Sequence, residues 1–181
     1  PGFLYQQNTM RDAMIAGMTL NIFNNHAERV KMANLAQTVN VLQAVILTEG
    51  EKLILTPTYH VLKMYAVHQD AQLIPVNFEI PLFEKMGESL PALSISASKD
   101  QNDQIHISLI NIDDTKAHEV SLDVSQLGVS GFEGSILTSN AIQDYNDFDN
   151  PEVITPQPMK KIKVKNGRAT IELPPFSVIV L

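Results

Sequence analysis

The hydrophobic pattern of this sequence changes its period near residue 70, and that change limits the folds that the chain can adopt. Residues 8–69 alternate helical patterns with short apolar runs. From Asp70 onward, apolar and polar residues alternate at period two, and turn residues interrupt them about every eight to fifteen positions. The first pattern is typical of α/β packing, and the second of an antiparallel sandwich. We therefore predict an α/β segment over residues 1–70 and a β-sandwich, without helices, over residues 71–181.

Two stretches of the first segment carry helix signals. In residues 8–27, Thr9 and Asp12 have the spacing of a capping box, and apolar residues recur on one side of the helix. Thr56 followed by Pro57 marks the start of a second helix, because threonine is a good N-cap and proline fits the first helical position. These helices flank the intervening apolar runs, as in an α/β unit.

Two short apolar runs between the helices indicate strands. Val30–Ala36 is apolar on both faces, as a buried strand of a parallel sheet is, and Ala44–Leu47 is a second run. Gln37 and Asn40 directly follow the first run, at the carboxyl end where α/β proteins place ligand-binding groups. Uncharged amides at this place suit hydroxyl-rich ligands such as sugars. The alternative is that both amides satisfy backbone groups of the loop.

Other residues that could take part in catalysis or metal binding have simpler explanations. Glu49 and Glu51 could form a carboxylate pair of the kind that hydrolyses glycosides, but an exposed Glu-Gly-Glu turn is more often only solvated. His60 and His68 are too far apart on one helix to share a metal. The acidic stretch Asp144–Asp149 lacks the glycine and the distal glutamate of a calcium loop, and it indicates a turn. We expect no metal and no cofactor.

The charge of the chain lies in its second half. Residues 1–70 carry equal numbers of acidic and basic side chains, so the whole net charge of −7 falls in residues 71–181. An acidic half argues against a nucleic-acid groove, which needs clustered lysine and arginine. The lysine-rich run Lys160–Lys165 alternates at strand period, and its simplest interpretation is the solvated face of an exposed strand.

Further protein classes are excluded by what the sequence lacks. None of its 181 residues is cysteine, so disulfides and thiolate metal sites are ruled out. No apolar run reaches the roughly 18 residues of a membrane span, and we expect no membrane contact.

The sequence starts at Pro1 without a methionine, and we expect it to be the C-terminal part of a longer protein. Its compartment stays open, because a missing signal peptide says nothing of a longer parent.

Long strings of the sequence resemble one known family. The string QQNTMRDAMIAGMTLNIFNNHAERVKMANLAQTVNVLQAVILTEG, followed by LTPTYHVLKMYAVHQDA, is similar to the α-L-arabinofuranosidases of glycoside hydrolase family 51. The likeness is dense over about 65 residues, and it continues more weakly at DYNDFDNPEVITP and LPPFSVIVL.

The resemblance implies a (β/α)8 barrel followed by a jelly-roll-type β-sandwich. Residues 1–70 would then be the incomplete C-terminal end of the barrel, and residues 71–181 the sandwich. The family removes terminal α-L-arabinofuranosyl groups from arabinan, arabinoxylan and arabino-oligosaccharides, retaining the anomeric configuration with two glutamates. Both glutamates lie upstream of the segment that matches Asn8, so we expect no catalytic residue here and no activity of this chain alone. Gln37, in LAQTVN, resembles a residue that lines the arabinose pocket, and Asn40 is the second candidate.

The same reading implies partners for the parent protein. We expect arabinose-containing polysaccharides or oligosaccharides as ligands, and a homo-oligomeric parent. The remaining barrel, or self-association, would cover the barrel surface that this chain exposes. The alternatives are a non-catalytic carbohydrate-binding sandwich and a purely structural one. The sequence favours the structural one, because it has no tryptophan and only Phe132, Tyr145 and Phe148 as aromatic residues between positions 84 and 175.

Overall fold

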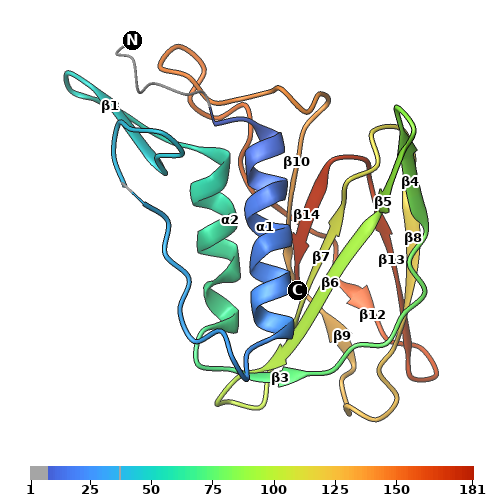
Figure 1. Cartoon of the computed structure of the whole chain (residues 1–181). Helices are drawn as coiled ribbons and strands as arrows, with labels where there is room; N and C mark the ends of the chain where they lie inside the picture. Colours follow the sequence, from blue (N-terminus) through green and yellow to red (C-terminus); the bar gives the residue numbers. More distant parts are fainter. Residues whose placement is uncertain (1–7, 37) are drawn as a thin grey trace.

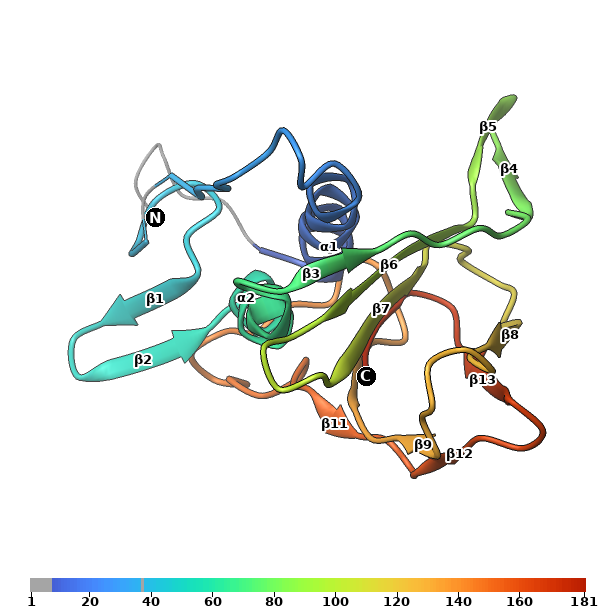
Figure 2. The same ribbon diagram turned by 90° about the horizontal axis from the view of Figure 1, so that it is seen from below.

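The computed structural model describes residues 8–36 and 38–181, and these form three layers (Figures 1 and 2). Two helices, α1 (Met10–Asn25) and α2 (Pro57–Tyr65), lie side by side on one face of a six-stranded antiparallel sheet. A short 3-10 helix, η1 (Ala66–His68), continues α2. Shorter strand pairs lie on the opposite face of the sheet. The described part of the chain is therefore mostly β-sheet with two α-helices.

The central sheet has the strand order β11-β10-β14-β7-β6-β3, and its pairs are antiparallel. The pairs β8–β13 and β9–β12 face it from the other side of the core, and the hairpins β1–β2 and β4–β5 project from the body (Figure 2). The strands are β1 (Ile46–Glu49), β2 (Lys52–Leu55), β3 (Gln72–Ile74), β4 (Leu82–Lys85), β5 (Glu88–Pro91), β6 (Leu93–Lys99), β7 (Ile105–Asn111), β8 (His118–Asp123), β9 (Gly131–Phe132), β10 (Ser135–Thr138), β11 (Gln157–Pro158), β12 (Ile162–Lys163), β13 (Arg168–Leu173) and β14 (Ser177–Val180).

The alternation along β6 shows how the sequence divides the two faces of the central sheet. Leu93, Ile95 and Ala97 point into the core between the strand layers. Ser94 and Ser98 point to the opposite face, where they bond to side chains of α1 and η1. Small hydroxyl side chains on that face let the helices approach closely and give their polar groups partners.

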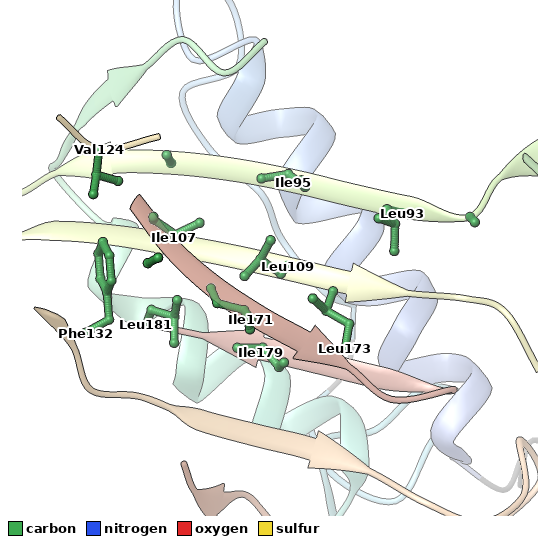
Figure 3. Close-up of a cluster of buried hydrophobic side chains, with 13 residues drawn as sticks. Leu93, Ile95, Ile107, Leu109, Val124, Phe132, Ile171, Leu173, Ile179 and Leu181 are labelled. Carbon is green, nitrogen blue, oxygen red and sulfur yellow. The ribbon is translucent and has the colours of Figure 1, made fainter. Parts of the chain in front are cut away.

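The first core fills the space between the central sheet and the shorter strand pairs, as Figure 3 shows. Leucine and isoleucine side chains from β6, β7 and β14 meet aromatic and aliphatic side chains from β9 and β13. Those contributed by the facing strands include Phe132, Ile171 and Leu173. This packing confirms the sandwich that the period-two pattern predicts.

The second core lies between the helices and the other face of the sheet, and it joins residues from both halves of the chain. Its buried members include Met10, Met14, Val61, Ile110, Leu137, Val178 and Val180. A Cβ built on Gly17 of α1 would lie 2.8 Å from Ile110 Cδ1. Glycine at this position therefore permits α1 to lie close against β7.

Both helix starts predicted from the sequence are confirmed. The Asp12 carboxylate accepts hydrogen bonds from the backbone N–H and the hydroxyl of Thr9, each 2.8 Å long. Thr56 is the N-cap of α2, Pro57 is its first residue, and the Thr56 hydroxyl accepts the N–H of Tyr59. No helix begins after residue 70 in the described part of the chain, as expected. No described helix is long and apolar enough to span a bilayer.

The strand expected over Val30–Ala36 does not form, and that prediction was wrong. The segment is extended but almost entirely exposed, with Met32 76% exposed, and no described strand pairs with it. A parallel strand needs neighbours to satisfy its backbone N–H and C=O groups, and an apolar run alone cannot supply them. The second run, Ala44–Leu47, contributes to β1, which forms an antiparallel hairpin with β2 that the sequence pattern had not indicated.

Candidate functional site

Asn40 lies in the loop that precedes β1, and its amide is engaged within that loop. Its Oδ1 accepts the backbone N–H of Thr48 at 2.7 Å, and its Nδ2 donates to the Thr48 hydroxyl at 2.8 Å. The backbone of Asn40 is left-handed, with φ 55°, a conformation that asparagine tolerates better than most residues. The exposed Asn40 thus fastens its loop to β1. Gln37, the other candidate, lies outside the described residues.

The N-termini of both helices hold the loop over residues 38–45. At α1, Gln43 Nε2 donates a 3.1 Å hydrogen bond to Asp12 Oδ1. At α2, the Thr56 hydroxyl donates to the Ala44 carbonyl at 3.1 Å, and the Thr56 backbone N–H donates to the Val45 carbonyl at 3.0 Å. Asp12 and Thr56 are buried, so these bonds are sheltered from water. Two helix ends therefore fix the course of this loop.

An apolar hollow of about 320 Å³ opens beside this loop, between α1, α2 and the segment 33–43. Its walls are mainly aliphatic and aromatic: Ile15, Ala16, Leu20, Phe23, Leu35 and Leu62. Its polar lining residues are Asp12, Thr19, Asn34, Gln43 and Thr58. The Thr58 hydroxyl is buried and has no hydrogen-bond partner among the described residues. A buried hydroxyl without a partner is costly, by about 1–3 kcal/mol.

Exposed apolar side chains are frequent on α1 and on the chain between α1 and α2. They are Ile15, Ile22, Met32, Leu35, Val39, Leu42 and Leu53. They come from α1, the extended segment that follows it, the loop and β2. Large apolar side chains left exposed on neighbouring segments of the chain are typical of a face that packs against other protein.

The histidines do not form a metal site. In residues 8–36 and 38–181, no group of three His, Cys, Asp or Glu side chains is placed to hold an ion. His68 Nδ1 lies 2.7 Å from Ser98 Oγ, and its ring packs 6.3 Å from that of His106. Burial, and then the neighbouring His106, lowers the pKa of His68 from 6.5 to about 4. This contact fastens η1 to the central sheet, and it is a structural role.

The carboxylate candidates are solvated or structural. Glu49 and Glu51 are exposed at the end of the β1–β2 hairpin. In the acidic stretch, Asp147 Oδ1 accepts the backbone N–H groups of Asp149 and Asn150. These bonds make a turn, as the sequence indicates. Neither group forms a catalytic pair.

The buried asparagines that escaped the sequence analysis include two that join separate elements. Asn21 of α1 is fully buried, its Nδ2 donates to the Ser94 hydroxyl, and its Oδ1 accepts bonds from the Tyr65 and Ser108 hydroxyls. Asn21 thereby joins α1, α2, β6 and β7. The second, Asn146, donates to the carbonyls at the end of β2 and at residue 154, and it links the acidic loop to the body.

No aromatic platform for carbohydrate binding is found on the described part of the sandwich. Phe132 is buried in the first core, and Phe148 packs against a small cluster around β1 and β2. Tyr145 is half-buried. The lysine-rich run alternates as expected, with Lys163 exposed and Ile162 packed against the core.

The arrangement is that of a β-sandwich domain with two helices packed on the outer face of one sheet. Comparison with known proteins identifies it further. Residues 1–177 match the sequence profile of the α-L-arabinofuranosidase C-terminal domain, and the chain belongs to that family.

Relatives of known function are similar to the chain over nearly its full length. It is 42% identical over 184 residues to an intracellular exo-α-L-arabinofuranosidase of Bacteroides ovatus, covering 99% of this chain and 35% of that protein. The crystal structure of the family 51 arabinofuranosidase from Xanthomonas axonopodis pv. citri matches with a TM-score of 0.93 at 42% identity, covering 99% of this chain and 36% of the other. A family 51 enzyme from Bifidobacterium longum matches with a TM-score of 0.88 at 26% identity, covering 99% and 36%. The chain thus spans about a third of the length of its relatives.

Proposed function

We propose that this chain is the C-terminal part of a retaining α-L-arabinofuranosidase. The enzyme would remove terminal α-L-arabinofuranosyl groups from arabinan, arabinoxylan and arabino-oligosaccharides. The observation that carries the proposal is the 42% identity, over 99% of this chain, to the Bacteroides ovatus exo-α-L-arabinofuranosidase. The catalytic glutamates of the family lie upstream of Asn8, so the activity belongs to the longer protein and this chain alone is inactive.

Residues 1–70 form the last part of the catalytic (β/α)8 barrel in this proposal, and residues 71–181 form a jelly-roll-type sandwich. Between α1 and α2 lie the segment over 30–36 and the hairpin β1–β2, and this alternation of helices with non-helical chain supports the proposal, because barrels also place non-helical elements between their helices.

The remaining barrel is the partner that we propose for the exposed apolar face and the hollow beside α1. Barrel strands packed there would cover the aliphatic side chains and supply a polar group to the Thr58 hydroxyl. Self-association of this chain would cover the same face when the barrel is missing. The complete protein is a homo-oligomer in this proposal, a state that size and light-scattering measurements would test.

Gln37 and Asn40 are the proposed substrate-binding residues. Their support is chemical and positional: both are uncharged amides in the LAQTVN stretch, directly after the extended segment. The loop over 38–45 is held at several points, so a side chain on it would meet a sugar with little loss of conformational entropy.

The activity is tested by expressing this chain and the complete protein encoded by the same open reading frame. Both are incubated with an aryl α-L-arabinofuranoside and with arabino-oligosaccharides, and released L-arabinose is quantified. We expect release by the complete protein only, with retained anomeric configuration in the first product seen by NMR. Release by this chain alone, or none by the complete protein, would refute the proposal.

The binding residues are tested in the complete protein by Gln37→Ala, with Gln157→Ala as the matched control. Gln157 is exposed on β11, and its side chain bonds only to Thr155 among the described residues. We expect a loss of kcat/KM of about five- to tenfold for the first variant, because one lost hydrogen bond to a sugar hydroxyl costs about 1–1.5 kcal/mol. Equal loss in both variants would contradict a sugar contact at Gln37.

A further inference from the structure

A buried side chain of α1 is bonded to the loop over residues 38–45. Asp12 is buried at the start of α1, and its two carboxylate oxygens serve different partners. Oδ2 accepts the N–H and the hydroxyl of Thr9, while Oδ1 accepts Gln43 Nε2 at 3.1 Å. The capping group of a helix is thus also the acceptor for a loop glutamine.

Gln43 lies where a tether has most effect on the loop. It follows Asn40 by three positions and has a left-handed backbone, with φ 56°. The next residue, Ala44, is fully buried and its carbonyl accepts the hydroxyl of Thr56. A left-handed backbone is less favourable for glutamine than for glycine, so the surrounding contacts must maintain this conformation.

The other end of α1 is bound to the central sheet, so the tether is rigidly supported. Asn21 is fully buried and bonds to Ser94 of β6 and to Ser108 of β7. The position of Asp12 is therefore set by the sandwich, through a continuous helix between Met10 and Asn25.

We propose that Asp12 is a positioning residue, which holds the loop over 38–45 in the place that sugar binding requires by accepting the hydrogen bond of Gln43. The inference rests on the proposed function, because it assigns the loop to the arabinose pocket. Asp12 does not touch the sugar; it acts through Gln43. Displacement of a contact group by about 1 Å can cost about a hundredfold in rate, so a lost tether is measurable.

The test uses the complete protein and the variants Gln43→Leu, Gln43→Glu, and the pair Asp12→Asn with Gln43→Glu. Leucine has about the size of glutamine and cannot bond, and glutamate places a second carboxylate against Asp12. In the paired variant the amide of residue 12 donates to the carboxylate of residue 43, so the bond is restored with its polarity reversed. Gln157→Leu is the matched control, an exposed glutamine of β11.

We expect Gln43→Leu and Gln43→Glu to lower kcat at least about tenfold, with KM changed less than threefold, and the paired variant to recover most of the loss. The melting temperatures of Gln43→Leu and of the paired variant stay within about 2 °C of the wild type, because Gln43 is partly exposed and one bond contributes only about 1 kcal/mol. Wild-type kcat in both single variants, or no recovery in the pair, would overturn the inference.

A failure of the proposed function gives a different result. If the unmodified complete protein releases no arabinose, the reaction is wrong, whereas an active protein insensitive to Gln43 substitution refutes only the positioning role. Hydrogen exchange of the loop amides adds a readout that is independent of activity. We expect faster exchange over 38–45 in Gln43→Leu than in Gln157→Leu, and equal exchange would refute the tether.

Discussion

Acid should destabilise the contact between η1 and the central sheet, and His68 is the group responsible. Its Nδ1 lies 2.7 Å from Ser98 Oγ on β6, and its buried Nε2 has no partner among the described residues. The rings of Tyr65 on α2 and His106 on β7 pack against it, and His106 Nε2 lies 3.3 Å from Asp100 Oδ2. A protonated His68 would therefore lie beside another histidine in a site that is partly shielded from water.

The size of the effect follows from the two protonation equilibria. Burial, and then repulsion from His106, lowers the folded-state pKa of His68 to about 4, against 6.5 for a free histidine. Between these values the unfolded chain binds more protons than the native one, so stability falls as the pH falls. The full difference of about 2.5 pK units corresponds to about 3 kcal/mol, of which about 2 kcal/mol is lost between pH 7 and pH 4.5. The stability that neutral His68 contributes is fully present above pH 6.5.

Urea unfolding of this chain at pH 7 and at pH 4.5, followed by far-UV circular dichroism, measures the loss. His68→Asn is the informative variant, because its amide can keep a bond to Ser98 and does not titrate. We expect its stability to fall by about 2 kcal/mol less than that of the wild type over this range. The matched control, the exposed His26→Asn, should behave like the wild type.

His60 also makes the chain less stable as the pH falls. Burial, with a smaller contribution from Lys63, lowers the pKa of His60. The comparison of His68→Asn with the wild type removes this contribution, because His60 is present in both. An NMR titration of the His68 ring with a midpoint near 6.5, or identical pH dependence in the two proteins, would refute the reasoning.

Three further changes should alter stability in predictable ways. Asn21→Leu removes the bonds to the hydroxyls of Ser94, Tyr65 and Ser108 and should lower the free energy of unfolding by about 3 kcal/mol, measured by urea unfolding; a loss below 1 kcal/mol would contradict the buried network. Gly17→Leu should lower it by about 2 kcal/mol or more despite better helix propensity, because even a Cβ would lie 2.8 Å from Ile110 Cδ1. Deletion of residues 1–70 uncovers the outer face of the sheet, and the remainder should bind a hydrophobic dye and lack cooperative unfolding; an unchanged melting midpoint would show that the helices are dispensable.

The sandwich could be predicted because its signals are local. Leu93, Ile95 and Ala97 alternate with serines along β6, and period two assigns one set to each face whatever the partners are. The helix starts at Thr9 and Thr56 were equally clear, because a cap is decided within a few residues. Strand order and the pairing of distant strands carry no such local signal.

The extended segment at Val30–Ala36 shows where a local pattern fails. Its composition is that of a buried strand, but burial depends on neighbours that no described part of this chain provides. The burial of Asn21 was missed for the opposite reason, because a polar residue in a helix is normally expected to face solvent. The stripe formed by Met10, Met14 and Gly17 reaches position 21 at its next step, and that spacing is the signal that places Asn21 on the buried side.

The candidate site could be located only in part. The order of residues around Gln37 and Asn40 points to a polar loop after an apolar run, but the tether from Gln43 to Asp12 spans 31 positions and has no sequence signature. A capping box explains Asp12 fully at the sequence level, so nothing suggests a second role. That the Asp12 carboxylate both caps α1 and accepts a bond from the loop can be recognised only from the partners of its two oxygens in the structure.

The two cores give the sandwich a role in the proposed enzyme that goes beyond covering the barrel. The serine-bearing face of β6 and β7 holds Asn21 on α1, and the start of the same helix holds Gln43 through Asp12. The link between sheet and loop is one helix of 16 residues, which is stiff over this length. A domain without catalytic groups therefore determines where the loop lies. Substitutions at the sheet–helix contact should then reduce activity by displacing the loop, without any contact to substrate.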